Sequence, residues 1–186
     1  KKVEVEALSG LEEVEFPNVG KLEAFYTDGL RTLLYTIKNV DDMWEKTLRY
    51  SGHVEKIKLL KALGFFDEKQ VEADGVIVSP KKLTVKLLEQ RLRKREVADI
   101  VALKVEVSGV KMGRKKGYIY RLLDRYDEKQ GITAMARTTA YTASIVTQLI
   151  LKKALKEKGV LPPEKIGMDG ELFRLFLNGL KKREII

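Results

Sequence analysis

The scarcest chemical groups of this sequence lie close together in one short segment. Arg49 and Tyr50 are followed by Gly52 and by His53, the only histidine of the chain. The arginine side chain is a planar fork of donors that suits a carboxylate, and tyrosine and histidine can carry protons. A glycine lets the backbone bend tightly or approach a ligand closely. Both a small ligand site and ordinary surface packing before a helix fit this spacing.

Two further segments carry polar groups that suit an anion. The segment "GVKMGRKKG", from 109 to 117, is basic and rich in glycine, but it separates two predicted strands and is typical of an exposed hairpin tip. Residues 133–144, "TAMARTTAYTAS", place Arg137 near the start of a predicted helix, where free N–H groups can bind an anion. The alternative there is a capped helix whose small residues allow close packing. The sequence has no glycine-rich dinucleotide fingerprint and no P-loop.

Composition excludes several kinds of site. The 186 residues contain no cysteine, which excludes disulfides, thiolate metal ligands and cysteine nucleophiles. Because a zinc site usually draws on several imidazoles, a single histidine argues against one, and we predict no metal. No apolar run reaches the roughly 20 residues of a membrane helix. The first residues lack the apolar core of a signal peptide. We therefore predict a cytoplasmic protein without a membrane partner, and the many Lys and Glu residues are compatible with a thermophile.

The net charge of +9 raises the question of nucleic-acid binding. Basic residues cluster at 91–95, 111–116, 151–158 and 181–183. Several of these clusters fall on or at the ends of predicted helices, where cations favour the negative end of the helix dipole. Interleaved aromatic residues, which would form a stacking platform, are missing. We interpret the charge as solvated faces and helix ends and predict no nucleic-acid partner.

Hydrophobic periodicity and turn signals predict helices laid against a mostly antiparallel or mixed sheet, an α+β fold. Ser79 and Pro80 predict a helix start, and Leu83, Leu87, Leu88 and Leu92 its apolar stripe. Asp28 is a candidate cap for the helix that follows it. The chain, 1–186, is interpreted as one domain. The predicted elements are strands at 3–7, 14–16, 22–26 and 76–78, helices at 30–34, 54–63 and 80–92, a hairpin over 99–126 whose first strand is half buried, an extended piece at 131–136, a helix from 138 to Gly159, a turn or one helical loop at 161–167 and a last helix from Asp169.

Four segments, in this order, resemble one known family. They are "LEAFYTDGLRTLL", "EKTLRYSGHVEKIKLLKALGFF", "YDEKQGITAMARTTAYTASIV" and "GVLPPEKIG". Together they resemble the C-terminal, substrate-binding half of the saccharopine dehydrogenase family, and most of all its lysine 6-dehydrogenase-like members. The resemblance covers nearly the whole chain. Ser51 departs from the proline that many relatives have between the tyrosine and the glycine.

The resemblance implies roles for particular residues. Arg49 is expected to bind the α-carboxylate of an amino acid such as lysine or saccharopine, and Tyr50 and His53 to orient the substrate or relay protons as catalytic residues. The other residues expected to bind substrate are Thr47, Leu48, Tyr26, Asp28 and Arg31.

The resemblance also implies an oxidoreductase that acts on a lysine-derived C–N bond and passes hydride to NAD or NADP. In this family a Rossmann domain precedes the substrate-binding domain, which often mediates a homodimer. No such domain is present in this sequence, so we expect the chain alone to be inactive and to bind no cofactor. We also expect its N-terminus to be incomplete and residues 160–186 to pack on the missing domain. The alternative is a non-catalytic module for amino-acid binding or dimerisation.

Overall fold

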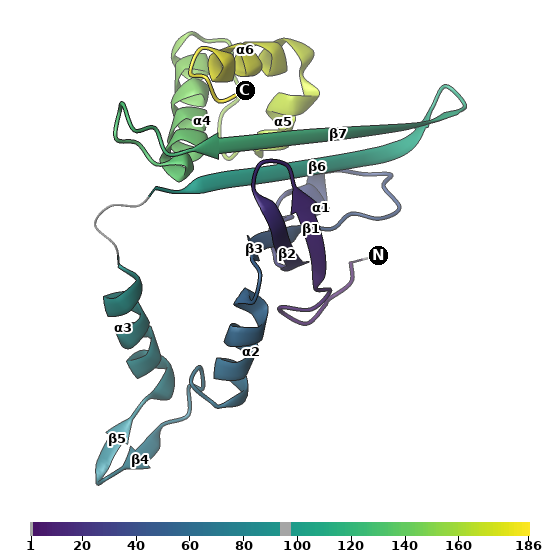
Figure 1. The fold of residues 1–186 in the computed structure, drawn as a ribbon. Helices are drawn as coiled ribbons and strands as arrows, with labels where there is room; N and C mark the ends of the chain where they lie inside the picture. The colour runs from purple at the N-terminus through teal and green to yellow at the C-terminus, as the bar shows by residue number, and fades with distance from the viewer. Residues whose placement is uncertain (1, 94–97) are drawn as a thin grey trace. The chain divides into compact units, whose positions relative to one another are not determined.

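The computed structural model describes residues 2–93 and 98–186. The chain divides into two compact units, unit 1 (Lys1–Glu96) and unit 2 (Val97–Ile186), which are described separately. Each unit combines helices with antiparallel strands (Figure 1), so the predicted α+β class is confirmed. No helix in the described ranges is long and apolar enough to cross a membrane.

Unit 1 is organised around a three-stranded antiparallel sheet of order β1-β2-β3. Strand β1 covers Glu12–Phe16, β2 covers Gly20–Tyr26 and β3 covers Lys46–Tyr50. In the register, Val14 faces Leu22 and Phe16 faces Gly20, so the side chains of one face alternate with those of the other. This alternation buries Phe16, Leu22 and Ala24 on one face of the sheet.

The predicted strand at 3–7 is wrong. Residues 2–6 form no regular structure, because their alternating valines find no strand to pair with in the described chain. The segment that follows is held instead by the sheet: the N–H of Tyr26 donates to the carbonyl of Ser9, and Gly10 packs against the ring of Tyr26.

Short helices and a small hairpin complete unit 1. Helix α1 is a single turn, Leu33–Thr36, and its N-cap is Thr32, so Asp28 does not cap it. Helix α2 (His53–Ala62) matches the prediction and ends before Gly64, whose φ of 79° suits a glycine C-terminal to a helix. Strands β4 (Val71–Ala73) and β5 (Val76–Val78) then form a hairpin, of which only the second strand was predicted.

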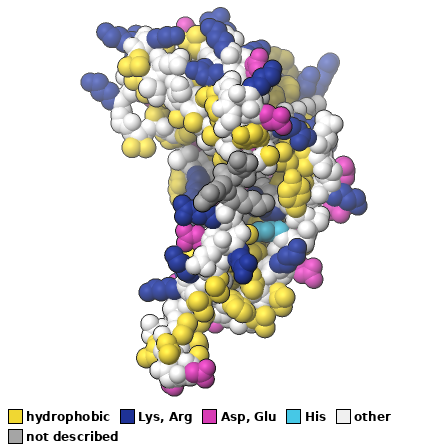
Figure 2. All heavy atoms as spheres, turned by 60° about the vertical axis from the view of Figure 1, so that its left-hand side comes forward, with side chains coloured by type: hydrophobic (Ala, Val, Ile, Leu, Met, Phe, Trp, Pro, Cys, Tyr) yellow, Lys and Arg dark blue, Asp and Glu magenta, His cyan; other side chains and the backbone are white. Residues whose placement is uncertain are grey.

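Helix α3 (Pro80–Leu92) begins as predicted, with the Ser79 hydroxyl accepting from the N–H of Lys82. Its predicted leucine stripe is not the buried face within the described unit, since Leu83, Leu87 and Leu92 are about half or more exposed whereas Thr84 is buried. Figure 2 shows hydrophobic side chains at the surface of the part of unit 1 that holds α2, α3 and the β4–β5 hairpin.

Unit 2 is built on one long hairpin. Strands β6 (Ile100–Lys111) and β7 (Arg114–Arg125) pair along their whole length. The turn is tighter than predicted, because Met112 and Gly113 both adopt positive φ angles, 52° and 72°, as a two-residue turn requires. Most of the hairpin is exposed, which corrects the expectation of a half-buried strand.

Three helices pack on one side of the base of this hairpin (Figure 1): α4 (Ala134–Leu151), α5 (Pro163–Met168) and α6 (Gly170–Lys181). Two predictions here are wrong. Residues 131–136 are not an extended segment, because α4 starts at Ala134, and α4 ends well before Gly159. Asp169 caps α6 as predicted, accepting from the N–H groups of Glu171 and Leu172. The buried core of this unit consists of Ile145, Leu149, Leu155, Ile166, Leu180 and Ile185.

Candidate functional site

Strand β3 carries the densest group of predicted site residues, but it divides them between two faces. In antiparallel pairing, residues directly opposite one another lie on the same face. Thr47 is opposite Phe25 and Arg49 is opposite Glu23. Leu48 and Tyr50 alternate with them and therefore point to the other face.

His53 joins Thr47 and Arg49. It is the first residue of α2, and its ring stacks on Phe25 with 6.0 Å between the ring centroids and 10° between the planes. Phe25 is almost completely buried and is the cross-strand partner of Thr47. Thr47, Arg49 and His53 thus share one face of the sheet. We call these three residues, together with Glu23 and Glu45, the β3 polar face.

The opposite face holds Tyr26, Leu48 and Tyr50, and there Tyr26 has a structural partner. The Lys46 ammonium lies 4.7 Å from the centre of the Tyr26 ring and 3.0 Å from a Glu12 carboxylate oxygen. The same ammonium donates to the carbonyl of Gly10 at 2.6 Å, and its side chain is only 10% exposed. Tyr50, by contrast, is 66% exposed. The structure therefore does not bring Tyr50 to the face that holds Arg49 and His53.

Asp28 and Arg31 lie in the exposed loop after β2. The Arg31 guanidinium contacts the Asp28 carboxylate at 3.1 Å, so the two residues pair with one another. Both side chains are more than 70% exposed.

Helix α2 takes its N-terminal cap from the sheet. Its N-cap position is Gly52, which has φ of 84° and no side chain with which to cap the helix. Glu23 supplies the missing acceptor, since its carboxylate accepts from the N–H of Val54 at 2.8 Å. A carboxylate at this position also interacts favourably with the positive end of the helix dipole.

This use of Glu23 leaves Arg49 available. Glu23 is directly opposite Arg49 across the strand pair, where a salt bridge would be ordinary. No such ion pair forms, and the Arg49 guanidinium donates to the backbone carbonyl of Leu48 at 2.8 Å. Within the described part of the chain, Arg49 has no carboxylate partner and is exposed. Its fork of donors is thus free to bind a carboxylate from outside.

Sequence reasoning missed Glu45, which precedes β3. Its carboxylate accepts from the Thr27 hydroxyl, from the N–H of Gly29 at 3.0 Å and from the Thr47 hydroxyl at 3.4 Å. The two hydroxyls are also 2.9 Å apart. A side chain at Gly29 would overlap the Glu45 carboxylate, so only glycine fits there without rearrangement. The signal lay in the cross-strand register, which a single sequence does not contain.

Arg137, the second candidate anion ligand, is structural. Its buried guanidinium contacts Asp124 and Asp127 at 3.0 Å each, and it donates to the carbonyls of Arg183 and Glu184. Burial alone would lower the pKa of Arg137, but hydrogen bonding and attraction to Asp124, with attraction to Asp127, raise it. The guanidinium ties α4 to the hairpin and to the C-terminal residues.

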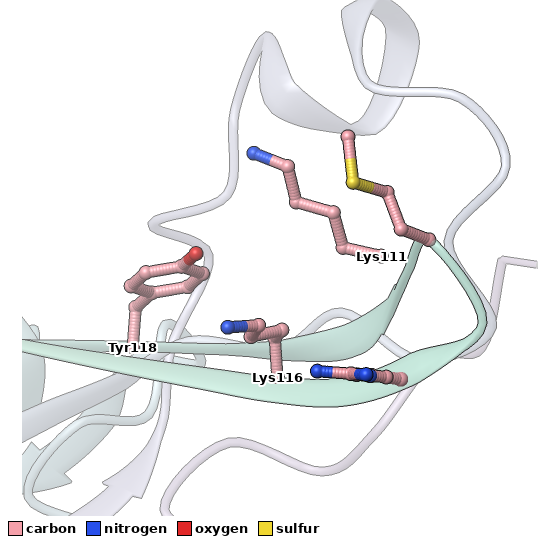
Figure 3. A pocket seen from close by; sticks show the side chains of 5 residues that line it. Lys111, Lys116 and Tyr118 are labelled. Atoms are coloured by element: carbon pink, nitrogen blue, oxygen red, sulfur yellow. The ribbon is translucent and has the colours of Figure 1, made fainter.

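The tip of the β6–β7 hairpin is hollowed on one side. Lys111, Met112, Arg114, Lys116 and Tyr118 line this hollow, and every one of them is exposed. Figure 3 shows the side chains of Lys111, Lys116 and Tyr118 on the same side of the hairpin. The segment is the exposed hairpin tip that the sequence predicted, and none of the residues predicted to bind substrate belongs to it.

Side chains cap the N-termini of the longer helices, where free N–H groups can bind an anion. The acceptors are Glu23 in α2, Ser79 in α3, Asp99 and Thr133 in α4 and Asp169 in α6. No group of three or more His, Asp or Glu side chains in the described ranges suits a metal ion.

Comparison with known families identifies the family of the chain. The family model described as the saccharopine dehydrogenase C-terminal domain matches residues 1–186, which is the whole chain. The chain therefore belongs to that family, as its four ordered segments indicate. This membership makes an oxidoreductase context the starting point for interpreting the β3 polar face.

Proposed function

We propose that this saccharopine dehydrogenase C-terminal domain is the substrate-binding part of an NAD(P)-dependent oxidoreductase that acts on the C–N bond of lysine, saccharopine or a related amino acid. We propose the lysine 6-dehydrogenase-like members as its subtype. The observation that carries the proposal is the state of Arg49, together with membership of the family.

Arg49 is suited to the α-carboxylate that all these substrates share. It is exposed, it lies on a regular strand, and its natural cross-strand partner Glu23 is committed to the cap of α2. A charge-assisted hydrogen bond to a carboxylate is worth about 1.5–3 kcal/mol when well placed, and the guanidinium fork can make two in parallel. Two such hydrogen bonds from Arg49 would hold the α-carboxylate of an amino acid in a fixed orientation.

The neighbours of Arg49 divide into two groups. Thr47 and His53 share its face, so they are proposed to contact the substrate, with His53 positioned by its stacking on Phe25. Tyr26, Leu48 and Tyr50 lie on the other face of the sheet. They remain candidates only if the substrate reaches around the edge strand β3, as do Asp28 and Arg31 in the neighbouring loop.

The nicotinamide, which would accept the hydride, is assigned to a Rossmann domain outside this sequence. This chain's own residues would bind and orient the amino acid. Residues 160–186 are proposed to pack on that domain, and the chain to form a homodimer. The competing proposal, a non-catalytic amino-acid-binding module, rests on the same Arg49 but needs no nucleotide domain.

Thermal unfolding with added ligand tests the proposal. A ligand that binds only the folded state stabilises it by about 2.7 kcal/mol at a concentration one hundred times Kd. We expect L-lysine or saccharopine to raise the melting temperature of the wild-type chain. We expect Arg49→Gln to abolish the increase, and Arg125→Gln, in unit 2, to leave it unchanged. The absence of any increase with a panel of amino acids would refute the substrate-binding role.

A second measurement separates the two proposals. The chain is joined or mixed with a nucleotide-binding domain of the same family, and the formation of reduced nicotinamide is followed with each amino acid. Turnover that disappears in Arg49→Gln supports the dehydrogenase. Ligand binding without turnover in the complete protein would support the non-catalytic module.

A further inference from the structure

From the β3 polar face we infer a second recognition group: Glu45 selects amino acids whose side chain ends in an amine. The inference rests on the proposed function, since it takes Arg49 as the group that binds the α-carboxylate. It assigns the opposite end of the same ligand to Glu45.

The register places the two groups in one row. Thr47 and Arg49 alternate with Leu48 along β3, so they point to the same side of the sheet. Glu45 directly precedes β3, and its carboxylate lies on this side because it accepts from the Thr47 hydroxyl at 3.4 Å. Four residues of strand span roughly 13 Å, at about 3.4 Å per residue. A cation-binding and an anion-binding side chain on one side of the sheet, separated by about this span, fit a ligand with opposite charges at its two ends and several methylene groups between them.

The Glu45 carboxylate is held in place before any ligand arrives. Thr27, Gly29 and Thr47 donate to it from two neighbouring segments. All three donors are neutral, and no Lys or Arg side chain in the described ranges forms an ion pair with Glu45. The carboxylate is thus oriented by the protein and its charge is not neutralised. An ammonium group is the ligand that such a carboxylate lacks.

The contrast with Glu23 sharpens the assignment. Both carboxylates lie on the same face, but Glu23 accepts from the N–H at the start of α2 and has a structural task. Among the described residues, Glu45 accepts only from neutral donors, and a glutamine oxygen could accept from the same Thr27 and Gly29 groups.

The test compares L-lysine with L-norleucine, whose side chain has the same four carbon atoms but no terminal amine. Their affinities are measured by calorimetry for the wild-type chain, for Glu45→Gln and for Glu15→Gln. Glutamine keeps an acceptor for Thr27 and Gly29, and Glu15→Gln removes the same charge from the β1 strand of the sheet. Melting temperatures without ligand show that each variant is folded.

We expect the wild type to prefer L-lysine about ten- to one-hundredfold, the range of one charge-assisted hydrogen bond. Glu45→Gln should lose this preference while its affinity for L-norleucine stays the same, and Glu15→Gln should keep it. If the wild type does not prefer L-lysine, or if Glu45→Gln keeps the preference, the inference is wrong while the proposed function stands. If neither amino acid binds the wild type, the proposed function itself fails. A wild type without the preference refutes the inference even if Glu45→Gln does not fold.

Discussion

Removal of the Arg137 side chain tests the account of unit 2 most directly. Arg137 and Asp124 are both less than a tenth exposed, and the guanidinium also binds Asp127 and two C-terminal carbonyls. Arg137→Met leaves the buried Asp124 carboxylate without its counter-charge, a change that costs about 3–5 kcal/mol in comparable pairs. We expect about 3 kcal/mol, the lower end, because Asp127 is 20% exposed and water can reach it.

Two companion variants separate charge from geometry. Arg137→Lys keeps the positive charge but loses the fork of donors, so we expect a smaller loss of about 1–3 kcal/mol. Adding Asp124→Leu to Arg137→Met removes both buried charges and should restore much of the stability, as replacement of buried ion pairs by apolar residues often does.

The measurement is urea unfolding followed by circular dichroism, with hydrogen exchange of α4 and of the C-terminal residues as the local readout. The N–H of Ile185, which donates to the carbonyl of Leu180, should lose protection in Arg137→Met. The pKa of Arg137 is raised, so its contribution is complete below the unfolded-state pKa and declines only as pH rises through the folded-state pKa. The free energy of unfolding that Arg137→Met loses should therefore be constant between about pH 6 and 9. If Arg137→Met loses no more free energy of unfolding than Arg137→Lys, this reasoning is refuted.

Two further predictions concern unit 1. Glu23→Ala removes the acceptor for the N–H of Val54 and should destabilise α2 by about 1 kcal/mol. The measurement is hydrogen exchange, which should become faster in the first turn of α2. Glu15→Ala, on the same sheet, should leave that exchange unchanged. Gly10→Ala brings a methyl group into the ring of Tyr26 at a φ of 62°, so it should lower the free energy of unfolding by about 1–3 kcal/mol in urea titrations, and a neutral result would mean that the N-terminal segment does not pack on the sheet in solution.

Local signals predicted those elements whose ends are fixed by neighbouring residues. Ser79 with Pro80, and Asp169, begin their helices because each cap bonds to an N–H only two or three residues away. Contacts distant in sequence were invisible. Helix α4 starts earlier than expected because Asp99, 35 residues upstream, accepts from the N–H groups of Ala134 and Met135.

The candidate site shows the same division. Residue types and spacing identified Arg49 and His53, which the structure brings to one face. Residue types and spacing did not place Tyr50 on the other face from Arg49 and His53. Alternation along a strand requires that placement once β3 is known to be a strand. Glu23 and Glu45 were missed, because their importance depends on which residues β2 and the loop after it place beside them.

The bond between Glu23 and the start of α2 has a consequence for how the sheet assembles. A slip of β2 by one residue against its neighbours would exchange its two faces, burying Glu23 and withdrawing it from the helix. The misaligned sheet would then lack both its buried apolar side chains and the helix cap, so a single slip would lose two separate contributions to stability. The cap of α2 thereby favours the correct register of β2. Because the position of Arg49 depends on that register, ligand binding requires a correctly paired sheet.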